Sequence, residues 1–225
     1  MIKTIEIESL TEFIALVNKY SLRSRTRLRL YRGQENINWD LIPKLARNGY
    51  SYEKFQDIEI KIIEEFERHS YQYDKGMFEY DEWELLALAQ HYGLPTRLLD
   101  WTSNPLTALW FAFKNEKSDD EERVVWGLSI KEEELADTSK EPFEQKFTMA
   151  FQPIHINRRI SAQSGWFTVH KLNVRNNIIP LNKQVRYNKR LVKFVFSNDN
   201  REKILKQLDV LGVNNMSMFP DLDGV

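Results

Sequence analysis

The chain has 225 residues and a formal net charge of −1, with no cysteine and four histidines. The lack of cysteine excludes a disulfide framework, a thiol nucleophile and a cysteine-based zinc site, and the histidines lack metal-type spacing, so we expect no metal. A composition that is 42% apolar and 12% aromatic is typical of a globular protein. No apolar run approaches the ~20 residues of a membrane-spanning helix, so we expect a cytoplasmic protein without a membrane partner.

Three helices are predicted in the first part of the chain, over residues 9–20, 52–69 and 81–93. Capping-box patterns open the first and the third of them. Gly93 ends the third, because glycine accepts the left-handed conformation that a helix C-terminus often needs. We expect the intervening residues 34–50 to be irregular.

Residues 27–33 alternate between polar and apolar side chains, which predicts a strand ending at Gly33. Arg32 falls on the same face as Leu28 and Leu30 by the two-residue period. An arginine on the core-facing side of a strand is unusual. Either it pairs with a carboxylate or it reaches a phosphate of a ligand.

The stretch from Gln90 to Phe113 predicts three elements in succession and contains the first candidate site residues. Pro95 stops the preceding helix, residues 97–101 form a short buried strand, and Pro105 follows a polar helix start at residues 102–104. Residues 106–113 are apolar on nearly every face, so we expect a buried helix. Polar residues between two buried elements are costly unless paired or used, so they are the first site candidates. These are Thr96, Arg97, Asp100, Thr102 and Ser103.

The rest of the chain predicts strands over 123–130, 147–151 and 190–196, two short extended pieces within 159–169, and a helix from 198 or 199 to Gly212. We see no repeat and no linker that divides the chain. The expected fold is therefore α+β: a single domain with a central, mostly antiparallel sheet, or split sheets, flanked by helices.

Charge is distributed unevenly along the chain. Residues 145–198 contain no acidic residue but ten lysines and arginines, whereas residues 115–144 are rich in acids. A long basic segment favours an anionic partner such as a nucleotide, a nucleic acid or an acidic protein. The alternative is that the two segments neutralise each other across the fold.

Four motifs together resemble a known family. They are Tyr-Arg-Gly-Gln at 31–34 and the runs 90–102, 159–168 and 219–224. In this order and spacing they resemble the FRG domain, a bacterial and phage-associated family named for its (Phe/Tyr)-Arg-Gly motif. The resemblance spans nearly the whole chain and implies a single FRG-type domain over residues 1–225.

The elements at 31–33 and 101–112 also resemble the ADP-ribosyltransferases of the arginine–serine–glutamate type. This second resemblance implies NAD as the cofactor, with Arg32 holding its pyrophosphate and Thr102 and Ser103 lining the nicotinamide-ribose pocket. His91 ends a helix, where it serves either as a structural imidazolium or as a general acid or base. The full cofactor-binding set is Arg32, Gly33, Gln34, His91, Arg97, Thr102 and Ser103.

The expected catalytic glutamate is missing from the third element of that pattern. Gln163 occupies the matching stretch and brings no negative charge. Carboxylates stabilise the oxocarbenium-like transition state of glycosyl transfer, so Asp100, Glu141 or Glu144 would have to substitute. The catalytic candidates are Arg32, Asp100, Ser103 and Gln163.

Two functions follow from these patterns. One is an ADP-ribosyltransferase or NAD glycohydrolase in a toxin or anti-phage defence setting. The other is a non-catalytic module that binds a nucleic acid or a partner protein through the Arg32 cleft and the basic 145–198 segment.

Overall fold

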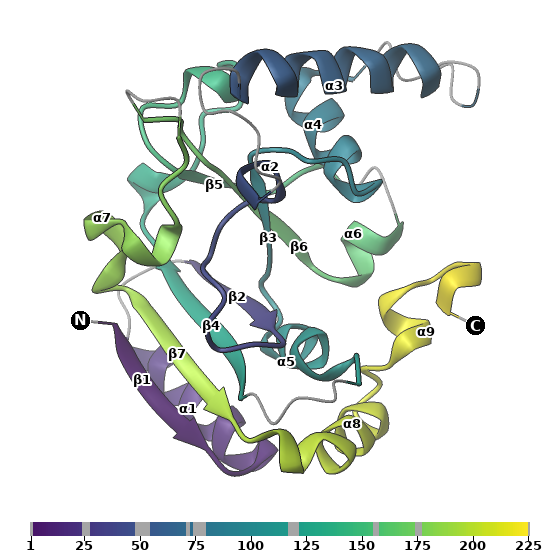
Figure 1. Cartoon of the computed structure of the whole chain (residues 1–225). Helices are drawn as coiled ribbons and strands as arrows, with labels where there is room; N and C mark the ends of the chain where they lie inside the picture. Colours follow the sequence, from purple (N-terminus) through teal and green to yellow (C-terminus); the bar gives the residue numbers. More distant parts are fainter. Residues whose placement is uncertain are drawn as a thin grey trace.

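The computed structural model describes residues 2–23, 28–47, 55–70, 73, 80–116, 122–154, 158–173 and 177–224. One seven-stranded sheet has the order β1-β7-β4-β2-β3-β6-β5 (Figure 1). β1 and β7 run parallel, and the five other pairings are antiparallel. The predicted mostly antiparallel sheet flanked by helices is confirmed. The strands are β1 Lys3–Ile7, β2 Leu28–Gln34, β3 Leu98–Thr102, β4 Arg123–Ile130, β5 Met149–Phe151, β6 Gly165–Val169 and β7 Leu191–Phe196.

Helices cover both faces of this sheet. The α-helices are α1 Leu10–Arg23, α2 Lys44–Arg47, α3 Phe55–Ser70, α4 Glu82–His91, α5 Pro105–Phe113, α6 Arg158–Ala162, α7 Val185–Asn188, α8 Arg201–Val210 and α9 Asn215–Met218. Short 3-10 turns are η3 Glu132–Glu134, η4 Pro142–Glu144, η5 Leu181–Lys183, η6 Asn198–Asn200 and η7 Leu222–Gly224. None of the described helices combines the length and the hydrophobicity that crossing a bilayer demands.

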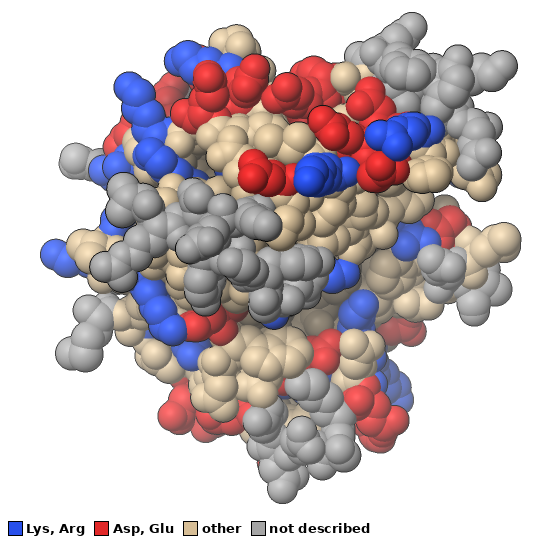
Figure 2. Space-filling view, turned by 45° about the horizontal axis from the view of Figure 1, so that its top comes forward, with Lys and Arg blue, Asp and Glu red and all other residues tan. Residues whose placement is uncertain are grey.

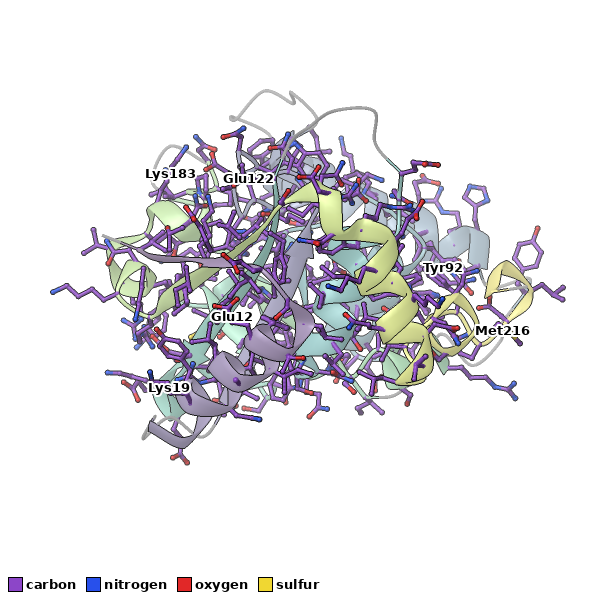
Figure 3. The ribbon with its side chains drawn as sticks, turned by 90° about the horizontal axis from the view of Figure 1, so that it is seen from below. Glu12, Lys19, Tyr92, Glu122, Lys183 and Met216 are labelled. Atoms are coloured by element: carbon purple, nitrogen blue, oxygen red, sulfur yellow. The ribbon has the colours of Figure 1, made fainter. Side chains whose placement is uncertain are left out.

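The main core lies between one face of the sheet and the helices α1, α5 and α8, through residues such as Phe13, Leu109 and Ile204. Figure 3, which views the molecule from below, shows α1 and α8 on the near face. A second cluster, around Trp126, packs on the opposite face. Because both faces are covered, β4 is apolar almost throughout, and every residue in it except Ser129 is buried.

The sheet opens between β2 and β3. Among the described residues these strands pair at one position, Tyr31 with Thr102, whereas β2 pairs with β4 over the whole range 28–34. The Arg32 side chain bridges the opening, with Nη1 donating to the backbone oxygen of Asp100 over 2.7 Å. The fold therefore exposes polar groups at the centre of the sheet rather than at its edge.

Helix α5 packs unusually close to β2, and Gly33 makes this approach geometrically feasible. A β-carbon built on Gly33 would lie 1.9 Å from the backbone oxygen of Ala108 and 2.6 Å from the backbone nitrogen of Ala112. Only glycine permits such contact between two backbones. The glycine of the Tyr-Arg-Gly motif thus has a packing role that its sequence pattern did not specify.

The structure corrects several predicted elements. Residues 158–162 form the helix α6 rather than an extended piece, and strand β6 begins only after Ser164, whose φ is 49°. The polar helix start predicted at residues 102–104 is confirmed, with Asn104 as the cap of α5: its side chain accepts from the backbone nitrogen of Leu106. The short helix α2 lies in the stretch expected to be irregular, and β1 was not predicted. The predicted starts at residues 27 and 52 lie outside the described residues.

Candidate functional site

A cavity of about 390 Å³ lies at the opening between β2 and β3. Its wall is built from the end of β2, strand β3, the end of α4, helix α5 and the C-terminal Phe219. The cavity therefore brings together segments from both ends of the chain and from its predicted central motif.

A chain of hydrogen bonds fixes the floor of the cavity. Arg32 Nη1 lies 3.4 Å from Asp100 Oδ2, and Gln90 Nε2 donates to both carboxylate oxygens of Asp100 over 3.1–3.2 Å. Thr96 Oγ1 donates to Gln90 Oε1 over 2.6 Å. The structure is therefore compatible with both predicted roles of Arg32: it pairs with a carboxylate, and it also lines a cavity that a ligand could occupy.

The guanidinium of Arg32 is incompletely compensated. Burial lowers its pKa, against the raising effect of Asp100. Its Nε is buried and has no hydrogen-bond partner among the described residues. An anion in the cavity would add a counter-charge to this guanidinium through its accessible atoms, because guanidinium groups bind oxyanions.

Three further cations line the cavity: Arg47, Lys114 and Arg159. Arg47 donates from Nε and Nη2 to the backbone oxygen of Ile42, at 2.8 and 2.6 Å. Its pKa is lowered by burial and by the nearby charge of Arg32. The fold thus holds two like charges, Arg32 and Arg47, close together at an energetic cost that an anionic occupant would offset.

Phe219 stands between the other two cations. Its ring centroid lies 5.3 Å from Lys114 Nζ and 5.1 Å from Arg159 Cζ. Asp221 then holds Arg159 in a bidentate pair, with Nη2 to Oδ1 at 2.7 Å. The predicted 219–224 motif is therefore part of the cavity wall, where it positions two basic side chains.

Two carboxylates line the cavity, Asp100 and Glu35. Glu35 accepts from Asn115 Nδ2 over 2.6 Å and raises the pKa of Lys114, which burial otherwise lowers. Glu35 was missed by the sequence reasoning, although it directly follows the Tyr-Arg-Gly-Gln motif. Glu141 and Glu144 line a different groove and do not line this cavity.

The structure brings most of the predicted site residues together. Arg32, Gly33, Gln34, His91, Asp100, Thr102 and Gln163 all line the cavity. Several of them also hold the fold together. Thr102 Oγ1 donates to the backbone oxygen of Gln163 over 2.6 Å, and Gln163 Nε2 donates to the backbone oxygen of Met218 over 3.0 Å. Gln34 Oε1 accepts from the indole nitrogen of Trp126.

Arg97 and Ser103 do not line the cavity. Arg97 is buried, and its Nε and backbone nitrogen donate to the two carboxylate oxygens of Glu59, at 2.6 and 2.7 Å. Ser103 is exposed, and its backbone nitrogen donates to the backbone oxygen of Ser164. Arg97 therefore has a structural partner on α3 that no local sequence pattern predicted.

Four of the ten basic residues of the segment form ion pairs within the part of the chain that the structure describes. Arg186 and Arg190 both pair with the buried Glu134, which lies in the acidic segment. Lys183 pairs with Asp40 over 2.6 Å, and Arg159 pairs with Asp221; both of these acids lie outside the acidic segment. These pairs interrupt the basic segment, so it is not a continuous free cationic surface.

Two histidines near the site have pKa values below the ordinary value of an imidazole. Burial, then the charge of Arg159, lowers the pKa of His91, which favours an uncharged imidazole at neutral pH. His170 is fully buried; burial, Arg32 and Arg97 lower its pKa to about 3. Its Nε2 lies 3.1 Å from Thr168 Oγ1.

The buried His170 predicts a loss of stability in mild acid. Below pH 6.5 the unfolded chain takes up a proton on this histidine, whereas the folded chain does not until about pH 3. Between pH 7.5 and 5.0 this difference lowers the free energy of unfolding by about 2 kcal/mol. Urea unfolding at both pH values should show that this contribution disappears in His170→Gln. It should persist in the control His69→Gln, because His69 is exposed. An equal pH dependence in His170→Gln and the wild type would contradict the assignment.

Comparison with known proteins identifies one family. Residues 27–121 match the model of the FRG domain, so an FRG domain is present in this chain. The match includes the 31–34 and 90–102 motifs. Searches of curated proteins and of solved structures returned no match. Among the described residues, no group of three or more histidine, aspartate or glutamate side chains is arranged to hold a metal ion.

Proposed function

We propose that the cavity binds a phosphorylated nucleotide, with NAD as its first candidate. The observation that carries this proposal is the convergence of Arg32, Arg47, Lys114 and Arg159 on one cavity that also has aromatic walls. Guanidinium groups match phosphate oxygens, and aromatic rings stack on bases. A volume of about 390 Å³ lies within the usual range of ligand pockets.

The aromatic side chains of the cavity differ in their exposure and in their contacts. Trp39 lines the cavity and is 45% exposed. Phe219 contacts Lys114 and Arg159 and orders the cations. This division supports a ligand whose planar ring and phosphates bind at different places in one cavity.

The carboxylates of Glu35 and Asp100 support a further step, an ADP-ribosyltransferase-like or NAD glycohydrolase reaction. In that reaction the bond between the ribose C1′ and the nicotinamide nitrogen breaks, and its electron pair leaves with nicotinamide. A carboxylate at the cavity wall would stabilise the positive charge that develops on the ribose. Water or a target side chain would then attack C1′. On this proposal Glu35 is the stronger candidate, because it accepts from one side chain, Asn115, whereas Asp100 is engaged by both Arg32 and Gln90.

Calorimetric titration with NAD tests the binding step. We expect Arg32→Ala to weaken binding at least about tenfold, because it removes the buried guanidinium that lacks an acceptor at Nε. The control Arg68→Ala removes an exposed arginine of α3 and should bind NAD like the wild type.

Free nicotinamide is followed in the same samples. Its release by the wild type would support the transferase or glycohydrolase reaction, and binding without release would leave a nucleotide-binding module. Equal affinities of the wild type and Arg32→Ala would contradict the proposed role of Arg32.

A further inference from the structure

A second hollow, of about 430 Å³, lies between α3, α4 and η4, away from the cavity described above. Its apolar wall consists of Ile60 and Ile63 of α3, Leu85 and Leu86 of α4, and Phe143 of η4. We refer to it as the α3–α4 groove. Figure 2, in which the top of the molecule comes forward, shows acidic residues gathered over this part of the surface around uncharged surface.

Helix α3 keeps part of its apolar surface only partly buried. It is sixteen residues long, and Phe55 and Glu59 are its buried residues. Ile60 and Ile63 are partly buried and line the groove, and Ile63 also packs against the core residues of α4. Partly buried apolar side chains beside a hollow offer a surface on which further apolar side chains can pack.

The rim of the groove carries a single sign of charge. Among the described residues, five glutamates line it and no lysine or arginine does: Glu64, Glu67, Glu82, Glu141 and Glu144. The pKa of Glu82 is raised by burial and by the neighbouring carboxylates of Glu141, Asp81 and Glu144. Within the part of the chain that the structure describes, none of the five side chains forms an ion pair. A cationic partner would relieve this repulsion.

We propose that the α3–α4 groove binds a basic, amphipathic helical segment of a partner protein. Apolar side chains at the i and i+4 positions would enter the groove, and flanking lysines or arginines would meet the glutamates of the rim. The apolar wall supplies affinity. The acidic rim favours a partner with positive charge and speeds its association. This inference is independent of nucleotide binding, because the groove and the cavity share no lining residue.

A displayed library of random 16-residue peptides tests this proposal on the full chain. We expect the enriched peptides to carry apolar residues at helical spacing flanked by lysine or arginine. Fluorescence anisotropy of one such labelled peptide should show at least about fivefold weaker binding to the double variant Glu82→Gln/Glu144→Gln and to Ile60→Ser. Both changes replace partly or fully exposed side chains, and thermal unfolding verifies that each variant is folded.

Glu65→Gln is the matched control, because Glu65 lies on α3 outside the groove and pairs with Arg68. Its affinity for the peptide should equal that of the wild type. The proposal is overturned if no peptide is enriched, if the enriched peptides are acidic or neutral, or if the control loses as much affinity as the groove variants. Self-association of the wild type that the groove variants abolish would assign the groove to a second copy instead and would also overturn it.

Discussion

Gly33→Ala is expected to lower the free energy of unfolding by at least about 3 kcal/mol. The new β-carbon would lie 1.9 Å from the backbone oxygen of Ala108. That neighbour is backbone inside helix α5, so no side-chain rotation can relieve the overlap. The whole helix must move away from β2, which also opens the core on that face of the sheet. Urea unfolding followed by tryptophan fluorescence measures the change.

Gly127→Ala is the matched control for this effect. Gly127 lies on β4 opposite Tyr31, and its added β-carbon would meet only the rings of Phe194 and Tyr31, at 3.4 and 3.6 Å. We expect a change of less than about 1 kcal/mol, because these are ordinary van der Waals distances and alanine restricts the unfolded chain more than glycine does. A similar loss in both variants would show that backbone conformation, rather than the contact with α5, makes Gly33 necessary.

Glu59→Ala is expected to cost about 3–5 kcal/mol of stability. Its carboxylate is fully buried, and it accepts both from Arg97 Nε and from the backbone nitrogen of Arg97. Removing it leaves a buried guanidinium without its counter-charge and a buried backbone nitrogen without an acceptor. Chemical unfolding of the variant against the wild type gives the difference.

Two further variants separate the effect of losing the buried ion pair from the effect of any substitution on helix α3. Glu65→Ala, on the same helix but in an exposed pair with Arg68, should change stability by less than about 1 kcal/mol. The double variant Glu59→Leu/Arg97→Met should be more stable than Glu59→Ala, because it leaves no buried charge unpaired. The single variants Glu59→Leu and Arg97→Met complete the comparison. If the double variant lost as much free energy of unfolding as these two single variants together, the unpaired charge would not be the cause of the instability of Glu59→Ala.

The central part of the site could be predicted because its signals are local. The run from Gln90 to Thr102 contains a helix end, a proline and a short strand, so polar residues between buried elements stood out. Asp100 was chosen on this basis and Arg32 from the alternation of residues 27–33, and the two are indeed neighbours. The capping box at Asp81 and the left-handed Gly93 were likewise confirmed, since each depends on only a few adjacent residues.

Contacts between distant segments could not be predicted from such patterns. No residue near Arg97 in the sequence indicates its partner. The partner, Glu59, lies on α3, and the pair is visible only once α3 is packed against the strand. Glu35 and Lys114 meet because β2 and α5 pack closely at Gly33. The basic segment looked continuous along the chain, yet two of its arginines, Arg186 and Arg190, pair with Glu134, which lies in the preceding acidic segment.

The single-domain boundaries and the catalytic candidates remain predictions. The FRG match covers residues 27–121, while the cavity also needs Arg159, Gln163 and Phe219 from beyond that range. Those three residues belong to the two later motifs of the FRG resemblance. Their position around one cavity gives these motifs a common physical role, because they complete the wall that the matched part begins.

The most direct measurement of the central claim compares NAD with its two phosphate-free nucleosides, adenosine and nicotinamide riboside, by calorimetry on the wild-type chain. If the four cations of the cavity bind phosphates, NAD should bind at least about tenfold more tightly than either nucleoside, and its affinity should fall as salt rises. Equal affinities for all three ligands, or no detectable binding of NAD, would contradict the assignment of this cavity to a phosphorylated nucleotide.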